Sequence, residues 1–301
     1  MTQDFIDKTF TVAIPVQLNV VNIWGTISIK KGDEEKVEVK AIKYIDSPYA
    51  KDTHIEIWQS EDGSVNVITR FIRCGIISLG KPCKVDYEIF TPQNTSSQIN
   101  TVSGLVRVTD LNGKHKITSV SAPVEINHVS GENEIKTVSG KIIGKGINGP
   151  VKYKTVSGSI RIEESSHPAI KSSTISGQTI IFSDIGKGPY QFTSVSGSSK
   201  LIVPKSTQCS VKAQCVSGYF RTDLNNSPKS IKPRSWNVDI EGGGTEIYMK
   251  SISGNLSVLS SENARGEVPS INQKSRQQRL VILRKFESGE LTIEETLTEL
   301  S

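Results

Sequence analysis

The residues of this chain that could act as nucleophiles are serines that recur before glycine in a V-S-G motif. A catalytic serine needs a base within reach and a strained turn, such as G-x-S-x-G, that exposes its hydroxyl. No such turn occurs, and no histidine recurs at a matching distance from the serines. The motif therefore indicates a structural element, and we assign no catalytic residue.

Cysteines and histidines are the next candidates, as metal ligands. Cys74 and Cys83 lie nine residues apart and Cys209 and Cys215 six apart, so neither pair has the C-x-x-C spacing of a zinc site. The four histidines are scattered along the chain. We predict no metal and no cofactor. We expect buried free thiols; a Cys74–Cys83 disulfide is the alternative and would need an oxidising compartment.

Acidic residues could bind calcium or cleave glycans. Calcium-binding nonapeptide turns place an aspartate in every turn, in the pattern G-G-x-G-x-D. The equivalent places here hold Leu105, Lys114, Glu132, Lys141 and Ser159. A β-helical lyase or hydrolase needs clustered carboxylates, but the acidic residues of this region do not recur at one place. Both activities are therefore disfavoured.

The element that carries the serines is a nine-residue repeat that begins at Thr101. Residues 101–172 divide into TVSGLVRVT, DLNGKHKIT, SVSAPVEIN, HVSGENEIK, TVSGKIIGK, GINGPVKYK, TVSGSIRIE and ESSHPAIKS, with glycine at the fourth place of six of the eight cells. The motif returns later as TISG, SVSG, CVSG and SISG. Such self-similarity is typical of a solenoid. The predicted corner residues are Gly104, Gly113, Gly131, Gly140, Gly149, Gly158, Gly177, Gly197, Gly218 and Gly254.

The alternation of residue types within a cell predicts short strands. Places two, six and eight are usually Val or Ile, as in Val102, Val106 and Val108, and we expect them to share one interior face. Polar residues at odd places would face solvent, and glycine at place four would let the chain bend. His115 and Asn133 fall at inward places, and we interpret them as polar interruptions rather than a ligand site.

Two cells make a coil of about 18 residues. The predicted fold class is mainly β: a parallel β-helix or β-roll solenoid, right-handed by the general preference of parallel crossovers, followed by a short C-terminal α-helical hairpin. Residues 1–260 would form the solenoid, with a looser capping part at 10–100 and the V-S-G repeats at 101–260. Pro204–Gln214 and Asn225–Gly244 interrupt the repeat and are expected to be loops or irregular coils.

The C-terminal tail belongs to a different class. Residues 261–272 are polar and indicate a linker, and residues 273–301 indicate two short helices. Because a unit of about 30 residues cannot bury a core alone, we expect the tail to associate with another copy or another protein. Its predicted interaction face is Leu280, Leu283, Phe286, Leu291, Leu297 and Leu300.

Composition restricts the partners further. The chain has 36 Lys and Arg against 31 Asp and Glu, and a net charge of +5 is too small a bias to indicate nucleic acid. No signal peptide and no run of about 18 apolar residues is visible. The expectation is a cytoplasmic protein with no integral membrane segment.

Several of these runs resemble a known family. LNVVNIWGTISI, VDYEIFTPQNTSSQINTVSG and the recurrent TVSGxIxI cells resemble the adhesin-like family called domain of unknown function 4097, over roughly residues 10–260. The resemblance implies a β-helical fold found in bacterial proteins, with no established activity or catalytic residues. The tail VILRKFESGELTIEETLTEL is similar to short helical modules of the SHOCT type, which implies oligomerisation or protein interaction.

These features predict a non-enzymatic bacterial scaffold that docks a partner or self-associates through its C-terminal helices. The alternative is a carbohydrate- or envelope-binding module of adhesin type, which would use the outward rows of the stacked strands. A surface that binds a glycan would require a row of exposed aromatic residues. The candidates for such a row are Tyr153, Tyr190 and Tyr219.

Overall fold

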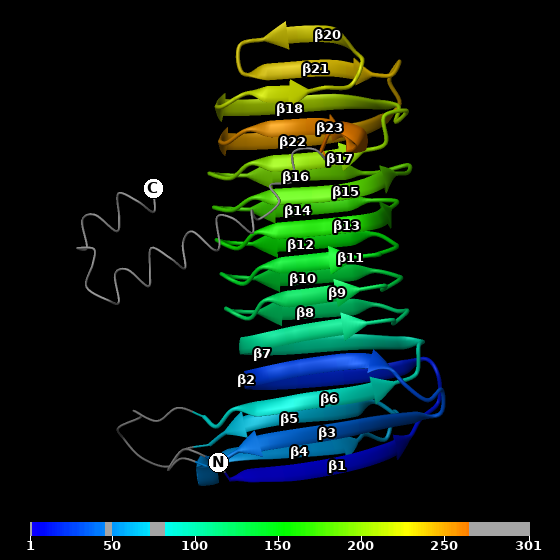
Figure 1. Cartoon of the computed structure of the whole chain (residues 1–301), viewed down its shortest axis with the longest axis vertical. Coiled ribbons are helices and arrows are strands. Elements are labelled where there is room, and N and C mark those ends of the chain that lie inside the picture. The colour runs from blue at the N-terminus through cyan, green and yellow to red at the C-terminus, as the bar shows by residue number, and fades with distance from the viewer. Residues whose placement is uncertain (1, 46–49, 73–81, 265–301) are drawn as a thin grey trace, which may run out of the picture. The chain divides into compact units, whose positions relative to one another are not determined.

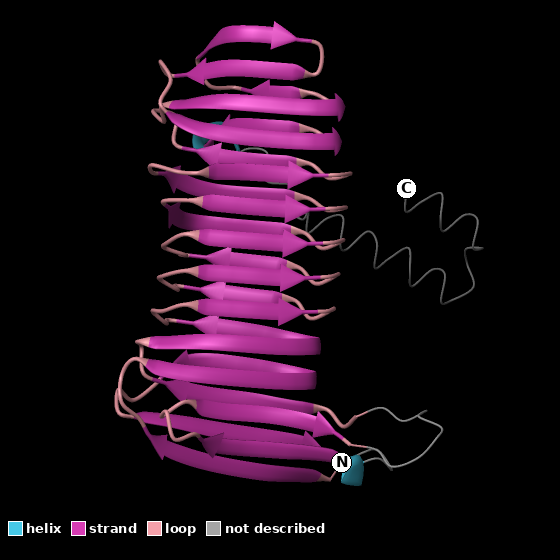
Figure 2. Ribbon diagram, turned by 180° about the vertical axis from the view of Figure 1, so that it is seen from behind, coloured by secondary structure: helices cyan, strands magenta, loops and turns pink. Residues whose placement is uncertain are grey.

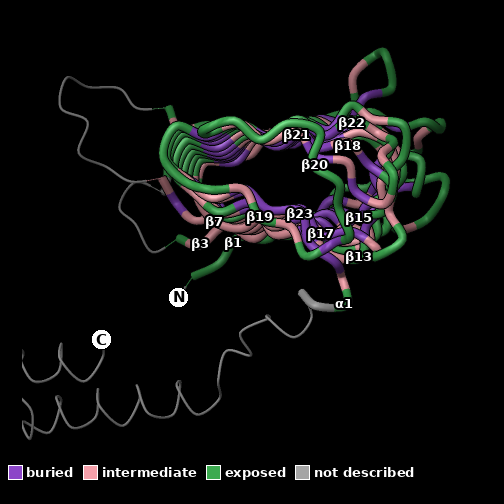
Figure 3. Tube along the Cα trace, turned by 90° about the horizontal axis from the view of Figure 1, so that it is seen from above, coloured by how far each residue is buried: buried purple, intermediate pink, exposed green. Residues whose placement is uncertain are grey.

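The computed structural model describes residues 2–45, 50–72 and 82–264, and residues 1–261 form one compact unit. The strands of this unit join in a single 23-stranded sheet. The sheet is stacked along one axis (Figures 1 and 2) and wraps round an interior lined by buried residues (Figure 3). Every functional candidate among the described residues therefore lies on the outside of this wall, inside it, or at a corner.

The N-terminal end of the stack is mostly antiparallel. β1 pairs with β3, β3 with β6 and β4 with β5 in antiparallel register, whereas the long β2 pairs in parallel with β5, β6 and β7. The elements here are β1 (Gln3–Thr11), β2 (Val16–Lys31), β3 (Lys36–Tyr44), the 3-10 helix η1 (Ala50–Asp52), β4 (Thr53–Gln59), β5 (Val65–Phe71) and β6 (Val85–Thr91).

The central part is parallel and regular. Asn133 lies opposite His115 in one neighbouring strand and Val151 in the other, each 18 residues away. We call each such set of two strands and two corners a layer. The strands are β7 (Thr95–Thr109), β8 (His115–Ser119), β9 (Val124–Asn127), β10 (Asn133–Thr137), β11 (Ile142–Lys145), β12 (Val151–Thr155), β13 (Ile160–His167), β14 (Ile170–Thr174), β15 (Thr179–Ile185), β16 (Tyr190–Ser194) and β17 (Ser199–Val203).

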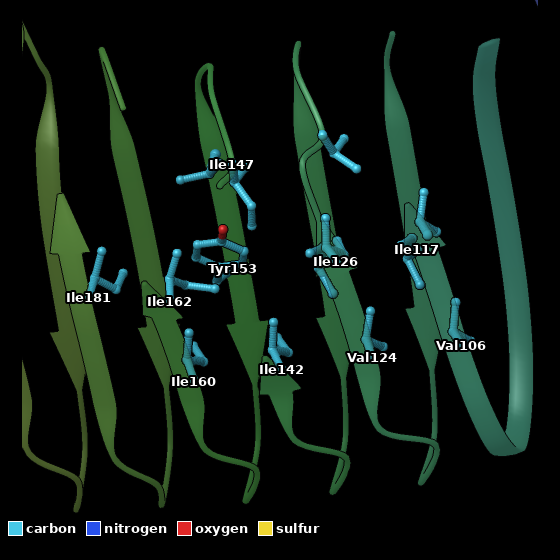
Figure 4. Close-up of a cluster of buried hydrophobic side chains, with 14 of the residues drawn as sticks. Val106, Ile117, Val124, Ile126, Ile142, Ile147, Tyr153, Ile160, Ile162 and Ile181 are labelled. Atoms are coloured by element: carbon cyan, nitrogen blue, oxygen red, sulfur yellow. The ribbon is translucent and has the colours of Figure 1, made fainter. Parts of the chain in front are cut away.

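Hydrophobic side chains from the two walls fill the interior in rows. Ile117 and Tyr153 project from one wall and Val124, Ile142 and Ile160 from the other (Figure 4), and all are buried. Because alternate residues of a strand share a face, the remaining side chains of these strands point to solvent. The core therefore fixes which side chains form the outer surface.

The C-terminal layers are not stacked in chain order. β22 pairs in parallel with both β16 and β18, and β23 pairs with both β17 and β19. The layer β22–β23 therefore lies between β16–β17 and the earlier β18–β19 (Figure 1). The elements are β18 (Cys209–Ser217), β19 (Phe220–Thr222), β20 (Asn226–Lys232), β21 (Ser235–Ile240), β22 (Thr245–Ser253), β23 (Leu256–Ser260) and α1 (Ser261–Ala264).

An antiparallel hairpin closes this end of the stack. β21 pairs with β18 and β20 pairs with β21. β20 is exposed along its whole length and contains Pro228, Lys229 and Lys232. Proline and lysine on an edge strand oppose the addition of another strand, so this hairpin protects the exposed end.

The fold class expected from the sequence is wrong. The expectation was a parallel β-helix that ends in an α-helical hairpin. The described chain is all β apart from η1 and the four-residue α1, in one nearly closed, barrel-like sheet with antiparallel pairs at both ends. The exposed edges of parallel layers need such covers, and a repeat pattern does not report them. The helical hairpin was expected at residues 273–301, which lie outside the described residues.

The two segments expected to be loops also need correction. Pro204–Gln214 contains the first half of β18, and Asn225–Gly244 contains β20 and β21. Of these strands, β20 and β21 lack the V-S-G motif, and they form the antiparallel cover over β18. The helices within the described ranges are too short and too polar to cross a membrane.

Candidate functional site

The outer surface carries a line of exposed aliphatic side chains, one in each of eight layers. They are the residues that precede serine in the TVSG motif and its variants, and they are 41–55% exposed. We call this set the aliphatic row, and in stacking order it is Val102, Val120, Val138, Val156, Ile175, Val195, Ile252 and Val216.

Main-chain hydrogen bonds hold the aliphatic row in register. The Ser139 N–H donates to the Val120 carbonyl (2.9 Å) and the Ser157 N–H to the Val138 carbonyl (2.8 Å). The same bond recurs from Ser176 to Val156, at 2.7 Å. With strands about 4.8 Å apart, eight residues extend over about 34 Å. The row is a straight, rigid feature rather than a scatter of surface valines.

Buried hydroxyls explain why these side chains point outward. The residue before each member of the row is buried, and it is Thr or Ser in every layer except that of Val216, where it is Cys215. The Gly140 N–H donates to Thr137 Oγ1 (2.8 Å), and the Gly158 N–H donates to Thr155 Oγ1 (2.9 Å). The hydroxyl points inward, where its oxygen accepts the hydrogen bond from the N–H of the corner glycine. Because successive side chains of a strand point to opposite faces, the next side chain points outward. The prediction that Val102 and Val156 point to the interior was therefore wrong, as was the solvent-facing place of Thr101.

The opposite corner of each layer behaves differently although its sequence is similar. Leu111, Val129 and Ile147 occupy the same place of their cells and are buried. Each follows a residue with positive φ, namely Asp110 (57°), His128 (50°) and Gly146 (64°). A left-handed residue interrupts the alternation and returns the next side chain to the core. The signal was present in the sequence, as Asp, His or Gly at the first place instead of Thr or Ser.

The predicted corner glycines lie in two stacked series. A Cβ on Gly158 would overlap the carbonyl oxygen of Gly140 one layer away, and a Cβ on Gly149 would overlap that of Gly131. Backbones of adjacent layers thus approach too closely at the corners for a side chain. The TVSG series contains Gly104, Gly140, Gly158, Gly177, Gly197, Gly254 and Gly218, and the opposite series contains Gly113, Gly131 and Gly149.

Lysines cover the wall that leads into the aliphatic row. We call this wall the lysine face: the outward side chains of the first half of β7 and of β8, β10, β12, β14, β16, β22 and β18. Its only acidic residues among those described are Glu134 and Glu246. Its lysines are Lys116, Lys136, Lys152, Lys154, Lys171, Lys212 and Lys250.

Both glutamates of the lysine face are held in ion pairs. Glu134 contacts Lys136 (2.8 Å) and Lys152 (3.1 Å), and Glu246 contacts Lys212 (2.6 Å). Hydrogen bonds from Lys136 and Lys152 lower the pKa of Glu134 to about 2. The face therefore keeps an excess of positive charge at neutral pH.

The interior contains buried polar groups next to the corners. His115 Nδ1 lies 2.8 Å from Ser97 Oγ, His167 Nδ1 lies 2.9 Å from the Gly149 carbonyl, and the Asn133 amide donates to the Gly131 carbonyl. Burial lowers the pKa of both histidines to about 4. These residues are neutral members of the core near its corners, and the described ranges contain no cluster of His, Cys, Asp and Glu suited to a metal.

The remaining candidates fall in different places. Tyr153 and Tyr190 are buried, so neither can contact a glycan, whereas Tyr219 is 53% exposed. Cys83, Cys209 and Cys215 are buried with free thiols, and Cys74 lies outside the described residues. So does the predicted interaction face of the tail: Leu280, Leu283, Phe286, Leu291, Leu297 and Leu300.

A shallow hollow of about 470 Å³ lies on the outer side of β1, β2, β3 and β6. Its apolar lining includes Phe5 and Ile42, and two of its three acidic residues are in ion pairs, since Lys30 contacts Glu88 (2.9 Å) and Lys84 contacts Asp86 (2.8 Å). The hollow is confined to the N-terminal end of the stack, whereas the aliphatic row continues through eight layers, so the row is the stronger candidate.

Comparisons with known proteins give structural similarity only. No family model and no curated protein matches the chain, so the resemblance to domain of unknown function 4097 and to SHOCT modules rests on the motifs. Similar crystal structures include a "putative lipid binding protein" from Parabacteroides distasonis, 13% identical, covering 85% of this chain and 96% of that chain at a TM-score of 0.43.

Two further crystal structures have comparable values. A "putative adhesin" from Parabacteroides merdae is 12% identical and covers 85% of this chain and 95% of that chain, with a TM-score of 0.41. A "putative adhesin" from Parabacteroides distasonis is 14% identical and covers 85% and 97%, with a TM-score of 0.39. At these values the chain is similar to proteins named as adhesins, and its function has to be argued from its own residues.

Proposed function

We propose that this chain is a non-enzymatic binding protein of adhesin type, which holds its partner against the aliphatic row. The observation that carries the proposal is the row itself: eight β-branched side chains, each about half exposed, in consecutive layers. Single exposed aliphatic residues are common on proteins, but a continuous line of them marks an interaction surface.

The chemistry of the serines supports a binding role over a catalytic one. Ser121 Oγ donates to the Val102 carbonyl at 3.1 Å, and Ser139 and Ser157 make the same contact in their layers. A hydroxyl engaged with main chain, with no base beside it in the described residues, is not an activated nucleophile. Of the histidines in these layers, His115 and His167 are buried in the core, and the exposed His128 lies at the opposite corner beside Asp110.

Two finer expectations belong to this proposal. Oligomerisation through residues 273–301 stays a prediction. A cytoplasmic location also stays a prediction, which the buried free thiols of Cys83, Cys209 and Cys215 suit, because reducing compartments keep thiols unpaired.

Co-sedimentation with cell envelopes tests the proposal. Envelopes prepared from lysed cells, with both membrane faces accessible, should retain the full-length chain. A Val138→Ser/Val156→Ser variant should be released, whereas Ile143→Ser should be retained. Ile143 is a matched control, since it is 43% exposed on β11, in the wall opposite the lysine face. The proposal fails if wild type is not retained, or if the double variant is retained equally well.

A further inference from the structure

We infer that the partner of the aliphatic row is the surface of an anionic lipid bilayer, with the lysine face against its headgroups. This inference rests on the proposed function and names its partner. It comes from the position of the lysines relative to the row, which no single motif of the sequence displays.

Lysines and aliphatic residues alternate along the same strands on the same face. Lys136 lies two residues before Val138, and Lys154 two residues before Val156, at the ends of β10 and β12. Lys250 has the same relation to Ile252 within β22. Residues two apart on a strand lie about 7 Å from each other and point the same way. Each of these layers therefore offers an apolar group and an ammonium side by side.

The excess positive charge is available to an external anion. Among the described residues, Lys116, Lys154, Lys171 and Lys250 have no carboxylate within ion-pair distance. Their long side chains can keep the ammonium at the headgroup level while apolar neighbours enter the acyl boundary. Apolar side chains bordered by lysines are the features that bind peripheral proteins to anionic membranes.

The same geometry disfavours the other occupants. A second copy seated on this face would bring two lysine faces together, which like charges oppose. A glycan would need stacked aromatic rings, but the row is aliphatic throughout. The row points outward at the corners where the chain turns, so its side chains form a ridge. A bilayer accepts a straight convex ridge, whereas a protein partner would need a matching slot about 34 Å long.

The attraction between the lysines and the anionic lipid surface sets how much a lysine substitution should weaken vesicle binding. Each lysine near an anionic surface strengthens binding about fivefold. Replacing two of them should therefore weaken binding about 25-fold, and the loss should shrink in high salt because salt screens the attraction.

Vesicle flotation with the full-length chain tests the inference. Vesicles of phosphatidylcholine alone are compared with vesicles in which about a third of the lipid is phosphatidylglycerol. We expect binding to the anionic vesicles at least about tenfold stronger than to the neutral ones. Lys154→Gln/Lys250→Gln should lose most of that binding, and Val138→Ser/Val156→Ser should lose it on both lipids. Lys145→Gln and Ile143→Ser, on the opposite wall, should bind like wild type.

The outcomes separate the inference from the proposed function. Equal binding of wild type to both lipids, or retention by the row variant, overturns the lipid inference, and the wild-type comparison stands even if a variant fails to fold. If vesicles do not bind but envelopes still do in a row-dependent way, the partner is a protein or a glycan and only the lipid inference fails. If neither binds, both fail.

Discussion

Acidification should destabilise this protein through two buried histidines before its carboxylates titrate. His115 and His167 have pKa values lowered by burial from 6.5 to about 4. Between these values the unfolded chain binds more protons than the folded chain, so the free energy of unfolding falls as the pH falls through this window. The loss from about pH 7.5 to about pH 5 is about 2 kcal/mol for each histidine and about 4 kcal/mol for both. Unfolded carboxylates titrate mostly below about pH 4.5.

Urea unfolding followed by circular dichroism at several pH values measures this loss. His115→Gln should remove about half of the pH dependence in the window, whatever it does to the absolute free energy of unfolding. His54→Gln provides the control, since His54 is exposed on β4. A free energy of unfolding that is constant from about pH 7.5 to about pH 5, or an equal slope in wild type and His115→Gln, would refute the reasoning.

Two further predictions concern the corners and the tail. Gly131→Ala should cost at least about 3 kcal/mol of unfolding free energy, because it combines φ of +103° with overlap of the Gly113 carbonyl. Gly63→Ala, at φ of +81° in open space, should cost about 1 kcal/mol; equal losses in thermal melts would contradict the stacking argument. Light scattering should show an oligomer for the full-length chain and a monomer for a chain that ends at Ala264. A monomer in both cases would refute oligomerisation through the tail.

The regular part of the fold could be predicted from its repeat, and so could a capping part within residues 10–100, but the strand pairing at the two ends could not. Glycine every nine residues, with Val or Ile between, indicates stacked short strands because the corner leaves no room for a side chain. The antiparallel covers, β1 with β3 and β20 with β21, depend on tertiary pairing of strands that lack the motif. Ile231 in β20 is 64% exposed. The hydrophobic pattern of the sequence therefore does not indicate that β20 is the outermost strand at this end of the stack.

The aliphatic row was not predicted because the second place of every nine-residue cell was assumed to point to the interior at both corners of a layer. Val129 and Val138 stand in identical V-S-G triplets, yet the first is buried and the second exposed. The residue before the triplet decides between them: His128 adopts φ of 50°, whereas Thr137 turns its hydroxyl inward to the Gly140 N–H. A reading that asked how each corner satisfies its backbone N–H groups would have separated the two classes.

The order of the last layers constrains how this chain completes itself during synthesis. β18 and β19 leave the ribosome before β22 and β23, yet the parallel partners of β18 and β19 are β22 and β23. Until residues 245–260 emerge, the segment from Cys209 to Ile240 has the antiparallel pairs β18–β21 and β21–β20 but no parallel layer beneath it. Growth of the wall therefore halts at β16–β17, whose open edge stays exposed for the time needed to translate two more layers. The final strands then close the gap by inserting between two structures already made, so the last step of folding is an insertion rather than an addition.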